Sequence, residues 1–183
     1  MNWTWLPNFL TIARCGLAFV VGWAILSLSP LWVLILFVFA AISDFFDGYA
    51  ARKLDAVSAF GAFLDPVADK LLVAAALAAL CIQMDGGLII LIPTVLIIAR
   101  DAGVTLIRLS PSIELPVISL AKWKTALEMV GIGGVLGAPL IAVGQAPIHT
   151  IGLILIWLAA ALSAYTGFHY LRQAITQMQN DRA

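Results

Sequence analysis

Residues 44–52 read Asp-Phe-Phe-Asp-Gly-Tyr-Ala-Ala-Arg, and residues 61–69 read Gly-Ala-Phe-Leu-Asp-Pro-Val-Ala-Asp. The two stretches hold four of the ten acidic residues of the chain, which are Asp44, Asp47, Asp65 and Asp69. The first two are three positions apart and the last two are four apart, and both spacings place a pair on one face of an α-helix. Because ionised carboxylates are costly in apolar surroundings, four of them together indicate a bound ligand.

The rest of the chain is strongly apolar. Hydrophobic residues make up 63% of the 183 residues and charged residues 11%, whereas a soluble domain carries roughly 25% charged residues. The mean hydropathy is +1.06. This composition excludes a soluble domain and predicts an integral membrane protein. The formal net charge of zero says nothing by itself about nucleic acid, and we expect no nucleic-acid partner.

Six apolar runs have close to the about 20 residues that a transmembrane helix needs. We therefore predict an all-α integral membrane protein with one membrane-embedded domain over residues 1–183. The predicted helices are residues 8–28, 31–51, 62–83, 87–109, 119–143 and 148–172. The breaks between them contain turn-forming residues, as in Asp85-Gly86-Gly87 and Gln145-Ala146-Pro147. Arg14 lies within the first run, so we interpret that run as a retained helix rather than a signal peptide.

The basic residues predict the orientation of these helices. The loops that follow the first, third and fifth helices carry no Lys or Arg. The cations in or near the other loops and the C-terminal end are Arg52, Lys53, Lys70, Arg108, Lys122, Lys124, Arg172 and Arg182. Only Arg100 is expected deep in a span. By the positive-inside rule, both termini and the basic loops are cytoplasmic.

The loop between the second and third predicted helices is short, so we expect these helices to be antiparallel neighbours whose four aspartates converge at one depth. Like charges a few ångströms apart repel by several kcal/mol at an effective dielectric constant near 20. Such a cluster takes up protons or binds cations. Oxygen ligands suit Mg²⁺ or Mn²⁺, and four carboxylates can hold two ions about 4 Å apart, which is the arrangement that clamps phosphoryl oxygens.

Three residues beside the aspartates fit a phosphate ligand. Gly48 and Gly61 leave room for a ligand close to the backbone, although helix packing explains either glycine equally well. Arg52 can contact phosphate through its bidentate guanidinium group. Lys53 next to it is interpreted as an ordinary cytoplasmic charge.

The full pattern, Asp-x2-Asp-Gly-x2-Ala-Arg-x8-Gly-x3-Asp-x3-Asp, resembles the signature of the CDP-alcohol phosphotransferase family. Its eight fixed positions are filled by Asp44, Asp47, Gly48, Ala51, Arg52, Gly61, Asp65 and Asp69. The resemblance implies the six-helix fold of that family, a homodimer, and a location in the cell inner (cytoplasmic) membrane with the active site facing the cytoplasm.

The resemblance also implies a role for each residue of the pattern. Asp44, Asp47 and Asp65 would ligate two divalent cations, Mg²⁺ or Mn²⁺, that hold the diphosphate of a CDP-linked donor. Asp69 would also touch the metal site and act as the base on the acceptor hydroxyl. The nucleotide side would be lined by Gly48, Ala51, Arg52 and Gly61. The hydroxyl attacks the phosphorus that bears the lipid alcohol, and CMP leaves.

A segment outside the signature contains further candidates for binding the CDP-linked donor. Pro7 to Arg14 resembles the N-terminal segment of the family's phosphatidylglycerophosphate synthases and cardiolipin synthases. Asn8, Thr11 and Arg14 recur every three residues and so share one helix face, which makes Asn8 and Thr11 candidate donor-binding residues. A helix cap at Asn8 and an Arg14 that extends to the interface are the structural alternative.

Three cations are candidates for binding an acceptor phosphate. Lys122 and Lys124 resemble the Lys-x-Lys-Thr segment of phosphatidylglycerophosphate synthases, although interfacial lysines with Lys124 paired to Glu128 are an alternative. Arg100 lies at a depth where it must face the protein interior or a wet cavity. Its partner can be acceptor phosphate, Asp101 or one of the four aspartates. The Arg-Asp pair here resembles cardiolipin synthases, whereas phosphatidylglycerophosphate synthases usually have Arg-Glu at this place.

We therefore expect a phosphatidyltransferase that uses CDP-diacylglycerol and glycerol 3-phosphate in the lipid bilayer. Phosphatidylglycerol as the acceptor, which gives cardiolipin, is the alternative, and another alcohol acceptor remains open. A cation transporter is the non-enzyme alternative. It is disfavoured because the chain has no internal repeat and its carboxylates lie at one interface rather than at the midplane. Four glycines between Gly131 and Gly137, with a Gly133-x3-Gly137 spacing, predict close helix packing.

Overall fold

The computed structural model describes the backbone of residues 5–53, 59–108 and 120–180, and the side chains of residues 12–43, 70–107 and 123–177. These residues form six α-helices and one short 3-10 helix. In chain order they are α1 (Trp5–Ser27), α2 (Pro30–Lys53), α3 (Ala59–Gln83), α4 (Leu88–Arg108), α5 (Leu120–Gly137), η1 (Ala138–Leu140) and α6 (Gln145–Asn180). The predicted all-α architecture is confirmed for the part of the chain that the structure describes.

The predicted boundaries are wrong for the last two helices. The prediction carried the fifth helix to residue 143, but α5 ends at Gly137 because Pro139 lies in the first turn of η1, and proline cannot continue the α-helical hydrogen bonds. The sixth helix was predicted over 148–172. Instead α6 begins at Gln145, with Pro147 in its first turn where an amide hydrogen is not needed, and it continues to Asn180.

The predicted turn at Asp85-Gly86-Gly87 is present, and it closes α3 with a defined hydrogen-bond pattern. The Gly86 amide donates to the Cys81 carbonyl (2.7 Å), and the Asp85 amide donates to the Ile82 carbonyl (3.1 Å). Asp85 and Gly86 have φ angles of 53° and 65°. This is the Schellman arrangement with a left-handed residue just after the helix, and it reverses the chain into α4 within four residues.

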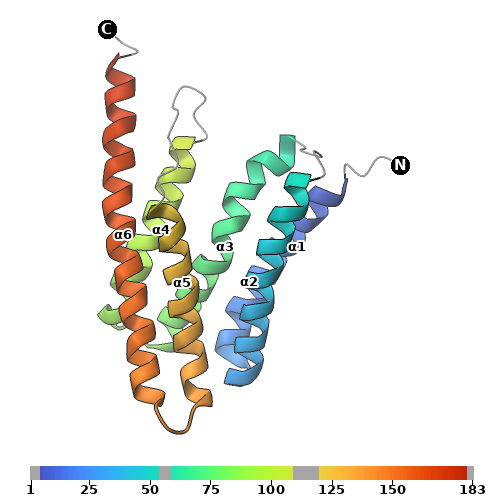
Figure 1. Ribbon diagram of the computed structural model, residues 1–183, viewed down its shortest axis with the longest axis vertical. Helices are drawn as coiled ribbons and strands as arrows, with labels where there is room; N and C mark the ends of the chain where they lie inside the picture. Colours follow the sequence, from blue (N-terminus) through green and yellow to red (C-terminus); the bar gives the residue numbers. More distant parts are fainter. Residues whose placement is uncertain (1–4, 54–58, 109–119, 181–183) are drawn as a thin grey trace.

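The helices alternate in direction, so the chain descends through α1, α3 and α5 and ascends through α2, α4 and α6 (Figure 1). The main packing partners are α1 with α3, and α6 with both α5 and α4. Two side chains fix neighbouring helix ends: the Gln83 amide donates to the Ile25 carbonyl (3.3 Å) and the Trp157 indole donates to the Ile89 carbonyl (2.9 Å). The end of α2, the start of α3 and the start of α1 consequently lie at the same end of the bundle.

The closest helix contact in the described structure is between α5 and α6. A Cβ atom added at Gly152 would lie 2.9 Å from the Gly131 carbonyl oxygen and 2.9 Å from the Val135 amide nitrogen, and one at Gly134 would lie 3.4 Å from the Gly152 Cα atom. The predicted Gly133-x3-Gly137 pair packs instead against Leu34 and Phe37 of α2, at 3.4 Å and 3.8 Å from the added Cβ atoms. The prediction of close packing is therefore confirmed, but Gly131, Gly134 and Gly152 make the tightest contact.

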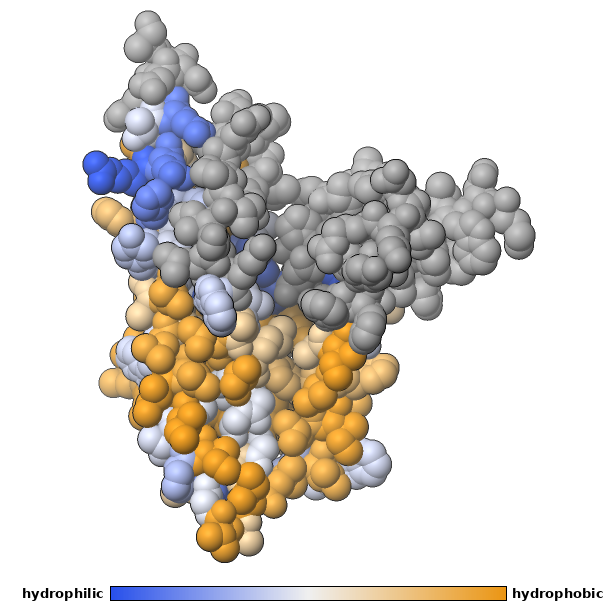
Figure 2. Space-filling view, viewed as in Figure 1, coloured by the Kyte–Doolittle hydropathy of each residue, from blue (hydrophilic) through white to orange (hydrophobic). Residues whose placement is uncertain are grey.

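The outer surface of the bundle is apolar. Large hydrophobic side chains are exposed on all of the long helices, for example Phe19, Phe39 and Leu106, and Figure 2 shows this apolar surface over most of the lower bundle, with hydrophilic residues on the upper part of α6. An exposed apolar surface of this extent is unfavourable in water and matches a lipid environment.

Not every predicted span is equally supported by the described side chains. Two described segments, Leu88–Ile107 and Gln145–Gln177, form helices long and apolar enough to cross a membrane. Shorter apolar helical stretches are Ile12–Ser27, Pro30–Ser43 and Lys70–Gln83.

We predict that Gly152→Ala destabilises the α5–α6 pair by about 1–3 kcal/mol, because the new Cβ atom meets backbone that cannot move aside without separating the helices. The measurement is the thermal midpoint of unfolding in detergent, which should fall.

Gly16→Ala is the matched control. No described atom lies within 4 Å of a Cβ atom added there, so the midpoint should stay the same or rise, since Gly costs a helix about 0.5–1 kcal/mol relative to Ala. Equal midpoints for the two variants would contradict the predicted contact.

Candidate active site

The aspartate-rich segments occupy the end of α2 and the first half of α3. Their α-helical backbone supports the same-face spacing of each aspartate pair, and α2 and α3 are antiparallel and in contact. The side chains of eleven predicted site residues lie outside the described ones, which are Asn8, Thr11, Asp44, Asp47, Gly48, Ala51, Arg52, Gly61, Asp65, Asp69 and Lys122. Their roles stay predictions. Within the described side chains, no group of three or more His, Cys, Asp or Glu residues is placed to hold a metal ion.

A buried ion cluster joins α4 and α5. Its centre is the Asp101 carboxylate on α4. The Arg100 Nη1 atom donates to Asp101 Oδ1 at 2.8 Å, and the Lys124 Nζ atom of α5 donates to the same oxygen at 2.5 Å. Lys124 Nζ also lies 3.1 Å from Glu128 Oε1, one turn further along α5. The Lys124 and Glu128 side chains are each only 2% exposed.

Lys70 joins this cluster from α3. Its Nζ atom donates to the Asp101 backbone carbonyl (3.1 Å) and to the Thr105 hydroxyl (2.9 Å). The Thr105 hydroxyl in turn donates to the same Asp101 carbonyl at 2.7 Å. Lys70 immediately follows Asp69 in the chain, so these bonds attach the aspartate-bearing part of α3 to the C-terminal part of α4.

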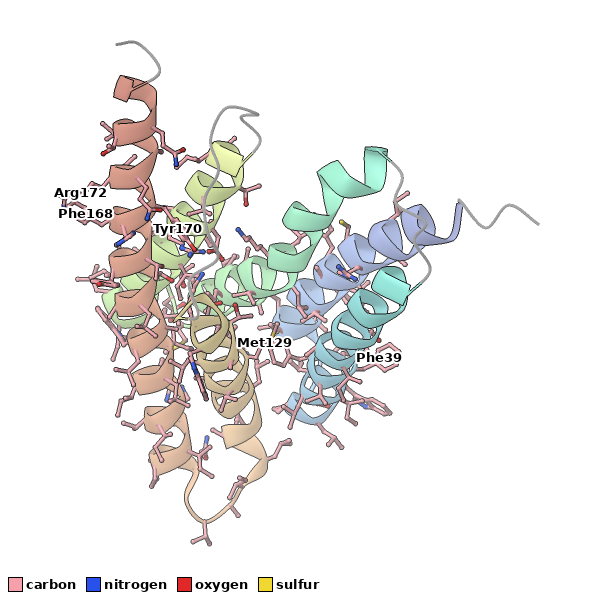
Figure 3. All side chains as sticks on the ribbon, turned by 45° about the horizontal axis from the view of Figure 1, so that its top comes forward. Phe39, Met129, Phe168, Tyr170 and Arg172 are labelled. Carbon is pink, nitrogen blue, oxygen red and sulfur yellow. The ribbon has the colours of Figure 1, made fainter. Side chains whose placement is uncertain are left out.

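Arg100 is held from the other side by α6. Its guanidinium carbon lies 5.4 Å from the centre of the Tyr170 ring, which is within the range of a cation–π interaction. A Cβ atom at Gly167 would lie 2.9 Å from Arg100 Cγ, so only glycine leaves space for the arginine side chain there. Tyr170 is fully buried, and Figure 3 shows it on the inner side of α6, whereas Phe168 and Arg172 point away from the bundle.

We use the name Asp101 cluster for Lys70, Arg100, Asp101, Thr105, Lys124 and Glu128. It contains three cationic and two carboxylate side chains, which is a formal excess of one positive charge. Among the described residues, the buried Arg100 Nε atom has no hydrogen-bond partner. Cationic N–H donors of this kind, including one without a described partner, suit an anionic ligand such as phosphate.

A cavity of about 330 Å³ lies between α3 and α4, next to the cluster. Lys70, Asp101 and Thr105 form its polar part. The remaining lining is apolar and comes from Leu71, Val73, Ala74, Ile97, Ile98, Ala102 and Leu106. Part of the Asp101 cluster is thus accessible from a largely apolar space rather than enclosed on all sides.

Both structural partners that the sequence offered for these cations are present, and the acceptor-binding role of Arg100 and Lys124 stays a prediction. The predicted Lys124–Glu128 pair is confirmed, and Asp101 is the carboxylate partner of Arg100. Arg100 is not the only cation at depth, because Lys70 and Lys124 reach the same aspartate. Of the predicted acceptor-binding residues, the structure brings Arg100 and Lys124 together.

Sequence reasoning missed Lys70, Gly167 and Tyr170. The position of Lys70 directly after Asp69 was an available signal. The two residues on α6 gave none, because a glycine and a tyrosine near a helix end have no pattern that predicts an arginine neighbour.

Comparison with known proteins confirms the family resemblance that the sequence predicted. The family model described as CDP-alcohol phosphatidyltransferase matches residues 4–165. A CDP-diacylglycerol–glycerol-3-phosphate 3-phosphatidyltransferase of Rickettsia bellii is 39% identical over 91% of this chain and 93% of that protein. The protein of the same name from Cereibacter sphaeroides is 34% identical over the whole of both chains.

A further relative carries a different name. A cardiolipin synthase (CMP-forming) of Oryza sativa is 34% identical over 75% of this chain and 46% of that protein. The match of the family model over most of the chain, the similarity to these relatives, and the apolar helices together establish the classification. The chain belongs to the CDP-alcohol phosphatidyltransferase family and is a membrane-bound enzyme.

Proposed function

We propose that this enzyme transfers a phosphatidyl group from CDP-diacylglycerol to glycerol 3-phosphate and releases CMP. The observation that carries the proposal is the pair of buried cations, Arg100 and Lys124, that meet at Asp101 next to the helix that bears Asp65 and Asp69. This arrangement suits a small acceptor with a phosphate group. The names of the relatives from Rickettsia bellii and Cereibacter sphaeroides support the same donor and acceptor.

Enzymes of this family generally use divalent metal ions, and the four aspartates of the signature are suitable ligands for such ions. Asp44, Asp47, Asp65 and Asp69 offer only oxygen ligands, which hard cations prefer. They lie on two antiparallel helices at one end of the bundle. We propose that they hold two ions, Mg²⁺ or Mn²⁺. When bound, such ions stabilise the negative charge that develops on the donor diphosphate.

The chain's own residues then bind the donor and move a proton. Asp69 accepts the proton of the acceptor hydroxyl as general base. The hydroxyl oxygen forms a bond to the phosphorus that carries diacylglycerol, the bond from that phosphorus to the bridging oxygen breaks, and CMP leaves with that oxygen. The residues proposed to bind the CDP part are Asn8, Thr11, Gly48, Ala51, Arg52 and Gly61.

The acceptor phosphate is proposed to bind Arg100, Lys122 and Lys124. Arg100 and Lys124 are already fixed by Asp101 and Glu128, so they lose little side-chain freedom when the acceptor binds. Charge-assisted hydrogen bonds from these groups to phosphate are stronger than neutral ones.

We propose that residues 1–183 form one membrane domain with six crossings in the cell inner (cytoplasmic) membrane. The alternating helix directions and the distribution of Lys and Arg support an active site that faces the cytoplasm. A homodimer is part of the proposal by analogy with the family.

Phosphatidylglycerol is the second candidate acceptor, and its product would be cardiolipin. The relative from Oryza sativa named cardiolipin synthase favours it, as does aspartate rather than glutamate after Arg100. Phosphatidylglycerol is also anionic, so the Asp101 cluster is compatible with both acceptors.

The test is CMP release from CDP-diacylglycerol by the purified protein in detergent with Mg²⁺ or Mn²⁺. Glycerol 3-phosphate and phosphatidylglycerol are offered in separate reactions. Release with glycerol 3-phosphate alone is the expected result. Release with phosphatidylglycerol alone would overturn the proposed acceptor and identify the second candidate instead.

Asp65→Asn should lower turnover at least about a hundredfold, because a neutral amide is a poor ligand for a hard cation. It should also weaken the metal-dependent binding of CDP, measured by calorimetry with and without Mg²⁺. Turnover equal to that of the wild type would remove Asp65 from the proposed metal site.

Asp69→Asn should reduce turnover by about 10²–10⁴-fold, the usual contribution of a general base, while donor affinity changes much less. Single-turnover CMP release and CDP-diacylglycerol binding measure the two effects separately. An equal loss of both would assign Asp69 to donor binding rather than to proton transfer.

Arg100→Lys keeps the positive charge but loses the planar group that bonds Asp101 and lies over Tyr170. We expect the KM for glycerol 3-phosphate to rise about tenfold or more, as loss of one charge-assisted hydrogen bond predicts. The KM for CDP-diacylglycerol serves as the internal control and should stay within about twofold. An unchanged acceptor KM would leave Arg100 with a structural role only.

A further inference from the structure

Asp101 is not among the predicted site residues, but it connects more helices than Arg100 or Lys124, the two predicted site residues whose side chains the structure describes. Its carboxylate accepts from Arg100 of its own helix and from Lys124 of α5, and its backbone carbonyl accepts from Lys70 of α3. Arg100 in turn lies against Gly167 and Tyr170 of α6. Four of the six helices therefore meet through Asp101 and its immediate neighbour.

The shared oxygen constrains the two cations that the proposed function assigns to the acceptor. Arg100 Nη1 and Lys124 Nζ both contact Asp101 Oδ1, at 2.8 Å and 2.5 Å. Long cationic side chains lose about 1.5–2 kcal/mol of rotamer freedom when they are fixed. Here that loss occurs on folding, so a phosphate meets two cations that already point toward one place.

Stability alone is a weak reason for this arrangement. Burying a set of charges costs several kcal/mol per ion, and well-packed apolar residues of similar volume are often at least as stable. The surroundings would suit apolar residues, because the adjoining cavity is lined mainly by Leu, Val, Ile and Ala side chains. A functional requirement for the position of the cations accounts for the charges.

We propose that Asp101 is a positioning residue of the acceptor site. It sets the separation and direction of Arg100 and Lys124, and through Lys70 it holds them at a fixed place relative to the segment of α3 that bears Asp69. This inference rests on the proposed function, since it assumes an anionic acceptor. Asp101 itself does not need to touch the acceptor.

The test is Asp101→Asn, which keeps the shape of the side chain and removes its charge. We expect the KM for glycerol 3-phosphate to rise about tenfold to a hundredfold, the scale of loss for misplaced binding groups. The KM for CDP-diacylglycerol should stay within about twofold, because the donor residues lie on α1, α2 and α3. A purely structural role would change both constants, or only the amount of folded protein.

Thr94→Val is the matched control on the same helix. Thr94 is also buried, and its hydroxyl has no hydrogen-bond partner among the described residues. This variant should keep both KM values. A wild-type acceptor KM in Asp101→Asn, or an equal rise in Thr94→Val, overturns the inference.

Should Asp101→Asn fail to fold, Asp101→Ser takes its place, because it also removes the charge and leaves a hydroxyl that can accept from one of the cations. The inference then predicts a raised acceptor KM at an unchanged donor KM, and an unchanged acceptor KM overturns it. The two proposals fail in different ways. A folded wild-type protein that releases no CMP with glycerol 3-phosphate contradicts the proposed function, whereas an active wild type with an indifferent Asp101 contradicts only the inference.

Discussion

A carboxylate between membrane helices is stable when cations and N–H donors surround it, and this constraint organises the centre of the molecule. Asp101 is paired with Arg100 and Lys124, and its carbonyl accepts from Lys70 and Thr105. Removal of the Asp101 carboxylate would leave buried cationic charge without this partner, at a cost of about 3–5 kcal/mol. The positions of α3, α4 and α5 therefore depend on each other through one residue. The same electrostatic requirement that holds these helices together also provides the positive charge that an anionic acceptor needs.

Much of the fold was predictable, because each helix corresponds to an apolar run and the turn at Asp85 and Gly86 has residues that adopt positive φ angles. The errors have physical causes. Pro139 lies inside an apolar run, so hydropathy extended the fifth helix past the residue that ends it. The apolar run ends near residue 172, but α6 continues through the polar residues that follow. Hydropathy predicts which residues are stable in lipid and does not predict where the backbone hydrogen bonds of a helix end.

The candidate site was predictable in its residue types more than in its connections. The spacing of the aspartates predicted a same-face pair on each helix, and the pairing of Lys124 with Glu128 followed from their separation by one turn. The contacts of Lys70 with Thr105, and of Arg100 with Tyr170, join residues 35 and 70 positions apart. Such contacts depend on how α3, α4 and α6 pack, and a single sequence contains no local pattern for them. Lys70 and Lys124 were predicted to lie near loops because they are close to loops in the sequence. Their side chains instead reach Asp101 inside the bundle, and closeness in sequence does not predict that depth.

The glycine contact between α5 and α6 has a consequence for how this protein can diverge. Gly131 is about two turns from Lys124 along α5, and Gly152 is about five turns from Tyr170 along α6, so each glycine lies on nearly the same side of its helix as a residue at the ion cluster. A larger side chain at either glycine must push apart two backbones that also carry Lys124 and Tyr170. Substitutions at these glycines are therefore limited although both lie far from the Asp101 cluster, because the geometry of that cluster depends on how closely α5 and α6 pack.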